Sequence, residues 1–202
     1  KSFKNKKIKY FFLKKKLGRT KALNFGLKKC KGKYIAILDA DDVAYSTRLK
    51  DQIIYLKKNE EISLLGSWGL KIDQKDKLLQ KISTSKKISD IKQMMLFKNL
   101  FIHSSIVFKK SILKEVGPYP TKLVYMQDYG FILKVMKKFN IYILPKVLTK
   151  VRVVKTSMTF NVPQSQIIKE QKSLLEFTRS NFYKNTLTKI FWFFEYTKVI
   201  IK

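Results

Sequence analysis

The chain has 202 residues, the length of one ordinary domain, and its 45% of hydrophobic residues can build a packed core, which argues against a disordered chain. Its formal net charge of +30 would suit nucleic acid, an anionic membrane or an acidic substrate. Because the lysines are spread along the whole chain and arginine, the usual reader of bases and phosphates, occupies only four positions, we expect no nucleic-acid partner.

The ends of the chain and its single cysteine bear on its cellular setting. Cys30 is the only cysteine, which excludes an internal disulfide and a thiolate metal cluster and favours a reducing compartment. The sequence shows no signal peptide and no apolar stretch of the ~20 residues that a membrane span needs. Lys1 is not a methionine, so we expect a processed chain or a piece of a longer protein. The expected location is the cytoplasm, with contact to the inner face of the plasma membrane.

The first part of the chain alternates strand and helix patterns. The apolar run at 8–13 predicts a buried strand, and a helical pattern then starts at Arg19 and ends before Gly32, which stands at the position of a C-cap glycine. That helix would bury one face, made of Leu23, Leu27 and Cys30. Residues 34–39 form an almost uninterrupted apolar run, typical of a strand buried on both faces in a parallel sheet. Ser46 can then cap a helix whose apolar stripe is Leu49, Ile53 and Leu56.

The middle and the C-terminal part of the chain continue this mixture. We expect one or two glycine-broken strands at 62–72, a partner strand at 78–82, a helix at 86–97, strands at 104–110 and 141–145, and a helix from Gln127 between the last two. From Pro163 a helical stripe follows, made of Ile167, Ile168, Gln171, Leu174, Leu175 and Thr178. The aromatic, lysine-flanked end at 187–202 would lie on a bilayer or dock on the core. The alternation indicates an α/β sheet flanked by helices.

Three of the few acidic residues, Asp39, Asp41 and Asp42, cluster directly after the run at 34–39. In an extended chain Asp39 and Asp41 would point the same way, at the edge of the sheet where α/β proteins bind ligands. Two hard oxygen ligands suit Mg²⁺ or Mn²⁺, with water and phosphate oxygens completing the shell. A divalent ion there could offset the charge of a diphosphate leaving group. Alternatively, Asp41 and Asp42 only cap the turn before the next helix.

Linked motifs around this cluster resemble those of the family 2 glycosyltransferases, the inverting enzymes with a GT-A fold. The chain shows Ala-x-Asn-x-Gly at 22–26, Gly-x-Tyr at 32–34 leading into Leu-Asp-x-Asp-Asp at 38–42, and Arg-Leu-x-x-Gln at 48–52. Further similarity lies in "FIHSSIVFKKSILKEVGPYP" and "QDYGFILKVMK", so that the resemblance covers roughly residues 5 to 160. It implies a Rossmann-like GT-A domain with a mostly parallel sheet over 1–160 and a helical, aromatic and basic extension over 161–202.

The resemblance implies a donor site that binds a nucleotide-sugar, most simply a UDP-sugar, together with Mn²⁺ or Mg²⁺. Asp41 would lie nearest the metal, and Asp39 near the ribose or the metal. The other residues implied on this side are Ala40 in the same motif, Lys21 and Asn24 on the first helix, and Arg152, which with Lys155 and Ser157 resembles a basic segment that closes over the diphosphate.

On the acceptor side, the resemblance implies that Asp128 is the catalytic base. The residue lies in the first turn of a predicted helix, where the macrodipole keeps a carboxylate ionised and able to accept a proton, although it could instead only complement that helix end. His103, the only histidine, precedes a strand expected to border the acceptor cleft. Gln127 stands where an acidic residue is common in the family, and Lys134 stands where arginine is usual.

The implied function is transfer of a sugar, of the hexosyltransferase type, to a hydroxyl of a glycan or lipid-linked acceptor with inversion, in cell-surface polysaccharide or lipopolysaccharide synthesis. The family's first strand, with its nucleotide-binding loop, is not found in the sequence, so the chain resembles an N-terminally truncated member. The alternative is therefore a non-catalytic remnant that binds a membrane or a partner. A basic nucleic-acid-binding module is a third, weaker hypothesis, which steep salt dependence without metal dependence would support.

Overall fold

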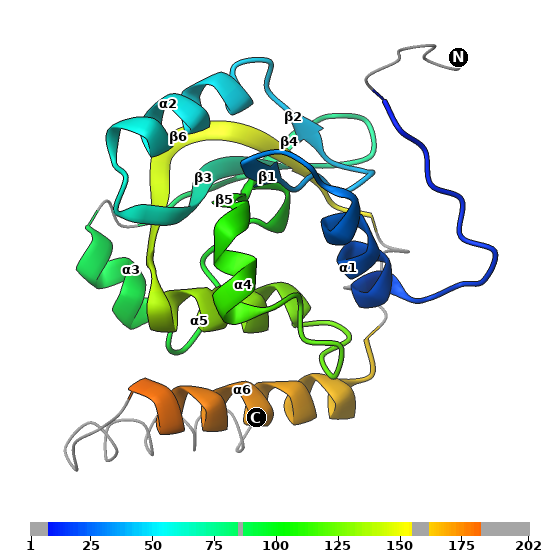
Figure 1. Ribbon diagram of the computed structural model, residues 1–202. Helices are drawn as coiled ribbons and strands as arrows, with labels where there is room; N and C mark the ends of the chain where they lie inside the picture. Colours follow the sequence, from blue (N-terminus) through cyan, green and yellow to red (C-terminus); the bar gives the residue numbers. More distant parts are fainter. Residues whose placement is uncertain (1–7, 85–86, 155–161, 183–202) are drawn as a thin grey trace.

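The computed structural model describes residues 8–84, 87–154 and 162–182. Its six-stranded sheet has the order β1-β5-β3-β6-β2, and β4 pairs with the C-terminal part of β3, from Gly69 to Ile72. The strands are β1 (Tyr34–Ala36), β2 (Val43–Ala44), β3 (Ile62–Ile72), β4 (Leu78–Ile82), β5 (Val107–Lys109) and β6 (Asn140–Arg152). The sheet curls between α2 on one side and α4 and α5 on the other (Figure 1).

The helices are α1 (Arg19–Lys29), α2 (Arg48–Lys58), α3 (Ile88–Met94), α4 (Leu113–Val116), α5 (Gln127–Lys138) and α6 (Gln164–Phe182), with 3₁₀ turns η1 (His103–Ser105) and η2 (Lys110–Ile112).

The combination of helices and a sheet confirms the α/β class, but the expectation of a mostly parallel sheet is wrong. Only β3 and β6 pair in parallel among the described strands, while β1, β2, β4 and β5 are all antiparallel to their partners.

Three local expectations for the first 40 residues are wrong. Residues 8–13 form no strand, because no other described strand lies beside them, and Phe12 is 97% exposed. The first helix ends at Cys30, in extended conformation, instead of at Gly32. The strand after it is short and lies at the sheet edge, so its burial alternates: Ile35 is buried, whereas the neighbouring Ala36 is exposed.

The long strand β3 is uninterrupted, although we expected its glycines to break it. A Cβ on Gly66 would lie 2.6 Å from the Phe101 ring, and one on Gly69 would lie 2.5 Å from Ile102 Cδ1. The two glycines therefore let Phe101 and Ile102, which directly precede His103 in η1, pack closely against β3.

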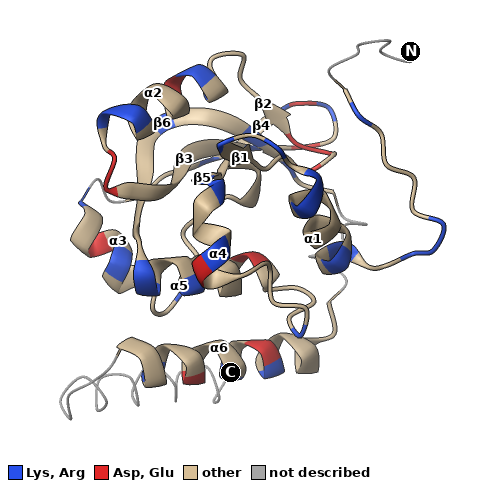
Figure 2. Cartoon of the chain, viewed as in Figure 1, with Lys and Arg blue, Asp and Glu red and all other residues tan. Residues whose placement is uncertain are grey.

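The core sits between the sheet and α5. Phe108, Phe131 and Tyr119 form a continuous aromatic cluster of tilted rings, with ring centroids 5.3 Å and 4.5 Å apart along the series. Leu174 of α6 joins the same cluster, so α6 is an outer layer packed on α5 (Figure 1). Lys and Arg occur on helices all round the molecule (Figure 2). Every helix of the described segments is too short or too polar to cross a bilayer.

Candidate active site

The aspartate cluster is a turn, because β1 ends at Ala36 and the chain then reverses. The amide of Asp42 donates to the carbonyl of Asp39 at 3.2 Å. We expected an extended strand to point the carboxylates of Asp39 and Asp41 the same way. This expectation is wrong, because the two residues lie in a turn. The expected helix cap at Ser46 is wrong, since α2 has Thr47 at its N-cap position. The alternative that Asp41 and Asp42 only cap the turn before this helix stays a hypothesis. That helix buries Leu56 but leaves the expected core residue Leu49 53% exposed.

The carboxylate of Asp39 is held by two partners that come from distant segments. Arg19 donates to Oδ2 at 2.8 Å, and Nδ1 of His103 lies 3.2 Å from both carboxylate oxygens. The backbone amide of Asp39 donates to the Ser104 hydroxyl at 3.0 Å. Burial favours the neutral acid, but the hydrogen bond and charge of His103 and the charge of Arg19 outweigh it and hold the pKa of Asp39 below its ordinary value.

Arg152 links the aspartate turn to the turn between β3 and β4. Its Nε donates to the Asp41 carbonyl at 3.1 Å, its backbone amide donates to the Asp42 carboxylate at 2.9 Å, and its guanidinium reaches the Asp73 carbonyl and the Asp76 carboxylate at 2.8 Å and 2.7 Å. Burial raises the pKa of Asp42 despite its hydrogen bonds. The guanidinium expected on the diphosphate is thus engaged within the protein.

Of the three aspartates in the turn, only Asp41 is exposed. No side chain or backbone group of the described residues makes a hydrogen bond or ion pair with its carboxylate. Within those residues, no group of three or more His, Cys, Asp and Glu side chains is placed to hold a metal ion. Mg²⁺ and Mn²⁺ are commonly held by one or two carboxylates, with substrate phosphates and water completing the shell. The chemistry of Asp41 fits such a substrate-completed cation, whereas at Asp39 a cation would compete with Arg19.

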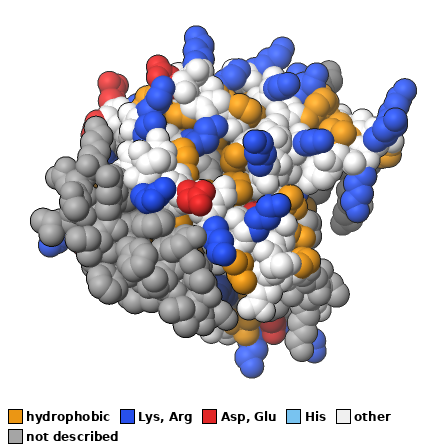
Figure 3. Space-filling view, turned by 90° about the horizontal axis from the view of Figure 1, so that it is seen from below, with side chains coloured by type: hydrophobic (Ala, Val, Ile, Leu, Met, Phe, Trp, Pro, Cys, Tyr) orange, Lys and Arg blue, Asp and Glu red, His pale blue; other side chains and the backbone are white. Residues whose placement is uncertain are grey.

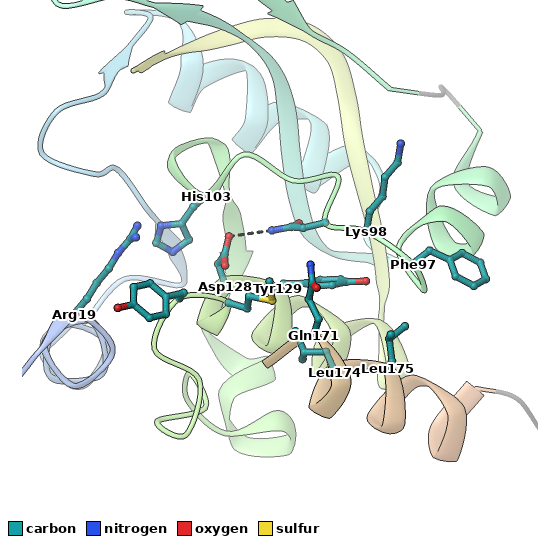
Figure 4. Close-up of a pocket in the computed structure, with 12 residues that line it drawn as sticks. Arg19, Phe97, Lys98, His103, Asp128, Tyr129, Gln171, Leu174 and Leu175 are labelled. Carbon is teal, nitrogen blue, oxygen red and sulfur yellow. Dashed lines mark hydrogen bonds between the residues drawn. The ribbon is translucent and has the colours of Figure 1, made fainter. Parts of the chain in front are cut away.

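A cavity of about 430 Å³ lies beside the aspartate turn and contains Asp128. Asp128 stands in the first turn of α5, and its Oδ2 accepts a 2.9 Å hydrogen bond from Asn99. Figure 4 shows Arg19 and His103 at one end of this cavity and Phe97 and Leu175 at the other, with Asp128 between them. Arg19 also lines a second hollow of about 430 Å³ between α1 and β1, which includes Asp39.

His103 connects the aspartate turn to the core as well as to the cavity. It is 8% exposed, and its Nε2 lies 3.1 Å from the hydroxyl of Tyr119. Burial raises the pKa of Tyr119 far above its ordinary value, so the phenol stays protonated. Sequence reasoning missed Arg19, Asn99 and Tyr119. Of these three, only Tyr119 lay in a stretch similar to the family, at the Gly-Pro-Tyr of 117–119 that ends "FIHSSIVFKKSILKEVGPYP".

The Arg-Leu-x-x-Gln motif is structural. Arg48 is 2% exposed and donates to the carbonyls of Ile37 and Ile106 at 2.8 Å and 3.2 Å and to Gln52, whose amide donates to the Ser105 carbonyl at 2.8 Å. Burial lowers the pKa of Arg48 to about 10. The motif therefore fixes the end of β1 against the η1 segment, two residues before Asp39.

Four other predicted site residues take different places. Asn24 is buried and exchanges two 2.9 Å hydrogen bonds with the backbone of Tyr119, so its amide is engaged inside the protein. Gln127 is 1% exposed and does not line the cavity. Its side-chain amide faces carbonyls of the preceding loop, and its nitrogen donates to them once the amide is oriented with the nitrogen on that side. Lys21 is exposed on α1, and Ala40 is exposed in the aspartate turn. Lys155, Ser157 and the aromatic end at 187–202 lie outside the described residues.

Comparison with known proteins gives relatives of one kind. The model of glycosyl transferase family 2 matches residues 1–117. An uncharacterised glycosyltransferase of Methanocaldococcus jannaschii is 33% identical over 90% of this chain and 61% of its own length. The amylovoran biosynthesis glycosyltransferase AmsE of Erwinia amylovora is 37% identical over 69% of this chain and 52% of its own length. The chain thus spans between half and two thirds of these two relatives.

A third relative has a more specific name, and a solved structure shares the fold. The Escherichia coli UDP-Gal:alpha-D-GlcNAc-diphosphoundecaprenol beta-1,3-galactosyltransferase is 28% identical over 91% of this chain and 69% of its own length. The structure of S. aureus TarS in complex with UDP-GlcNAc aligns with a TM-score of 0.58 at 14% identity, covering 91% of this chain and 61% of that one. The GT-A type of fold is thereby confirmed, and the chain belongs to glycosyl transferase family 2.

Proposed function

We propose that the chain carries the catalytic centre of an inverting glycosyltransferase that moves a sugar from a nucleotide-diphosphate sugar to an acceptor hydroxyl. One observation carries the proposal. Arg19 and His103, which hold the Asp39 carboxylate, line the same cavity as Asp128. The acidic turn suited to a donor is therefore linked, through Arg19 and His103, to the cavity whose separate carboxylate, Asp128, suits an acceptor.

On the donor side, the proposed contact is Asp41, whose exposed carboxylate can share a Mn²⁺ or Mg²⁺ ion with the diphosphate. When bound, that ion would offset the negative charge that develops on the leaving diphosphate. Asp39 has a different role in this proposal. Its contacts with Arg19 and His103 hold the turn in place, so that it positions Asp41 and the donor ribose.

On the acceptor side, the proposed base is Asp128. The Asn99 amide donates to its Oδ2 and leaves the other carboxylate oxygen to accept the acceptor's hydroxyl proton. As that proton moves to Asp128, the hydroxyl oxygen bonds to the anomeric carbon. The bond from that carbon to the diphosphate breaks on the opposite face, and the electron pair leaves with the diphosphate. One such displacement inverts the anomeric centre.

The lining of the cavity favours a sugar attached to an apolar group as the acceptor. Polar side chains lie around Asp128 and His103, whereas Phe97, Leu174 and Leu175 line the other end (Figure 4). Lys98 lies on the same wall and could pair with a phosphate that joins sugar to lipid. The names of two relatives, one for amylovoran biosynthesis and one for a diphosphoundecaprenol-linked sugar, agree with this class. The proposed setting is the inner face of the plasma membrane.

Calorimetric titration of UDP and GDP into the chain, with and without Mn²⁺, tests the donor site. We expect metal-dependent binding of UDP that Asp41→Asn abolishes. Glu115→Gln, which removes an equal charge at an exposed position on α4, is the control and should bind as the original chain does. A folded chain that binds neither nucleotide would instead support the non-catalytic remnant.

A further inference from the structure

A buried carboxylate on α6 holds the backbone that leads into α5. Glu170 is 2% exposed and accepts hydrogen bonds from the successive backbone amides of Val124, Tyr125 and Met126 at 2.9, 3.0 and 2.9 Å. The side-chain amide of Gln166, one turn earlier on α6, adds a fourth at 2.8 Å. All four contacts come from N–H groups, which together satisfy both carboxylate oxygens.

This carboxylate lies beside the N-terminal end of α5 and contacts the residues that lead into it. Met126 is the N-cap residue of α5 and makes no capping hydrogen bond with its own side chain. The first amides of a helix have no partner within the helix, and the helix dipole favours a negative charge beside them. Burial alone would raise the pKa of Glu170, but its hydrogen bonds lower it, so the carboxylate is ionised at neutral pH. Glu170 thus binds the amide of the N-cap residue and the two amides before it, and it places a negative charge beside the start of α5.

The carbonyl groups of the same segment also have a side-chain partner. The end of the Gln127 side-chain amide faces only carbonyl acceptors there, so the amide is oriented with its nitrogen toward them; in that orientation it donates to the Val124 carbonyl at 2.8 Å and to the Tyr125 carbonyl at 3.2 Å. The amides of 124–126 are therefore bound by Glu170, and two of their carbonyls are bound by Gln127. An acidic residue at position 127 could not donate to those carbonyls, which explains glutamine there. Asp128 lies two residues after this held segment, with only Gln127 between them.

We propose that Glu170 is a positioning residue for the transfer reaction, which fixes the first turn of α5 and with it the direction of the Asp128 carboxylate. The proposal rests on the function assigned to Asp128 above. It makes α6, which begins beyond residue 160, part of the catalytic unit. In agreement, Gln171 and Leu174 of α6 and Tyr125 and Met126 of the held segment line the same cavity as Asp128 (Figure 4).

The test compares Glu170→Gln with Glu176→Gln. In Glu170→Gln one oxygen becomes an NH₂ group, which faces an amide donor instead of accepting from it. Glu176 is the other acidic residue of α6 and is exposed, so Glu176→Gln makes the same change of charge on the same helix without touching the held segment. The experiment uses the whole chain, with hydrogen exchange read at individual amides.

In Glu170→Gln we expect the amides of 124–126 to exchange at least about tenfold faster, because their local opening becomes easier. We expect kcat for transfer to fall about 10- to 100-fold, as small displacements of a reacting group have effects of this size. The dissociation constant of the donor should stay within about twofold, because the aspartate turn is not touched. Glu176→Gln should match the original chain in all three measurements.

Unchanged amide exchange in Glu170→Gln would overturn the proposal, as would faster exchange with unchanged kcat. An equal loss of donor affinity and kcat would also overturn it, since that indicates general unfolding. If Glu170→Gln does not fold, Glu170→Asp keeps the charge on a side chain one methylene shorter. It should show the same changes to a smaller extent, and original values in that variant would contradict the proposal.

A chain without any transfer activity would refute the proposed function but still leave the positioning testable. The ¹³C signal of the Asp128 carboxyl group then reports its surroundings directly. A shift of that signal in Glu170→Gln but not in Glu176→Gln would show that Glu170 sets Asp128. An unchanged signal would overturn the inference.

Discussion

Arg19 and Asp39 form an ion pair of 2.8 Å that joins the first residue of α1 to the aspartate turn. The pair is partly exposed, at 34% for the arginine side chain and 25% for the aspartate. Arg19 is also part of the wall of the cavity that contains Asp128. The guanidinium therefore stands between the proposed donor and acceptor sides, a position that no sequence motif indicated.

Arg19→Met should raise the pKa of Asp39, because a cation that favours the ionised form is removed. A carboxyl group with a lowered folded pKa contributes stability above its unfolded pKa and loses it as the pH falls through the folded value. The stability contributed by the ionised Asp39 should therefore be smaller in the variant, and its loss on acidification should be complete at a higher pH. An NMR titration of the Asp39 carboxyl carbon measures this directly.

Lys28→Met is the matched control for that titration, since Lys28 is exposed on the last turn of the same helix. It should leave the midpoint of Asp39 unchanged. If the midpoint is also unchanged in Arg19→Met, the hydrogen bond of His103 alone sets the ionisation of Asp39, and Arg19 has no electrostatic role there.

Arg48→Met should destabilise the fold, although it removes a charge from a chain of net charge +30. The buried guanidinium satisfies the carbonyls of Ile37 and Ile106 and the Gln52 side chain. Each buried acceptor left without a partner costs about 1–3 kcal/mol, so we expect a loss of about 2–5 kcal/mol in the free energy of unfolding. Denaturant unfolding measures it. Lys50→Met, exposed on the same helix, should stay within about 0.5 kcal/mol, and an equally small effect at Arg48 would contradict the structural role.

Arg152→Met separates two roles for this arginine. The structure engages its guanidinium with the Asp41 carbonyl and the 73–76 turn, whereas the family resemblance implies the diphosphate. If it only orders the turn, UDP and UDP-sugar should lose affinity, and so should Mn²⁺ binding in the absence of nucleotide. A loss confined to the diphosphate-bearing ligands, with intact metal binding, would show direct phosphate contact. Calorimetry with each ligand decides between them.

The elements that the sequence predicted best are those whose patterns depend on local burial. The periodicity of α5 was confirmed, since it follows from which side chains face the core. The pairing of β4 with β3 was also confirmed, but β4 is largely exposed, and its pairing follows from the short turn that joins the two strands. Strand direction was not predictable in the same way. The apolar run at 34–39 looked like an inner parallel strand, but direction depends on partners distant in the chain, here β5.

In the candidate site, too, some residues could be predicted from the sequence and others could not. Asp39, His103 and Asp128 could be named from motifs, and the structure brings Arg19 and His103 onto Asp39 across 20 and 64 residues. Arg19 and Glu170 could not be named, because a surface arginine and a helical glutamate have no pattern that marks their partners. The basic side chains remain spread over the molecular surface in the face seen in Figure 3, so composition alone could not single out one lysine or arginine.

Asp128→Asn should remove transfer and leave donor binding intact. Asparagine keeps the shape of the side chain and one oxygen for the Asn99 amide, but it cannot accept the acceptor's proton. Loss of a general base typically costs about 10²–10⁴ in rate, so kcat should fall by that factor while the dissociation constant of UDP-sugar with Mn²⁺ stays within about twofold. Single-turnover kinetics and calorimetry on the same preparation give both values.

Asp51→Asn is the control for this variant, because Asp51 lies on α2 and pairs with Lys146 away from the cavity. It should keep the original kcat. A further variant, Asn99→Asp, places a second carboxyl group beside Asp128, and repulsion between the two should raise the apparent pKa of the pair. The acid limb of the pH–rate profile should then move to higher pH. Full activity in Asp128→Asn, or an acid limb that stays in place in Asn99→Asp, would remove Asp128 from the chemistry and leave it as a residue that complements the start of α5.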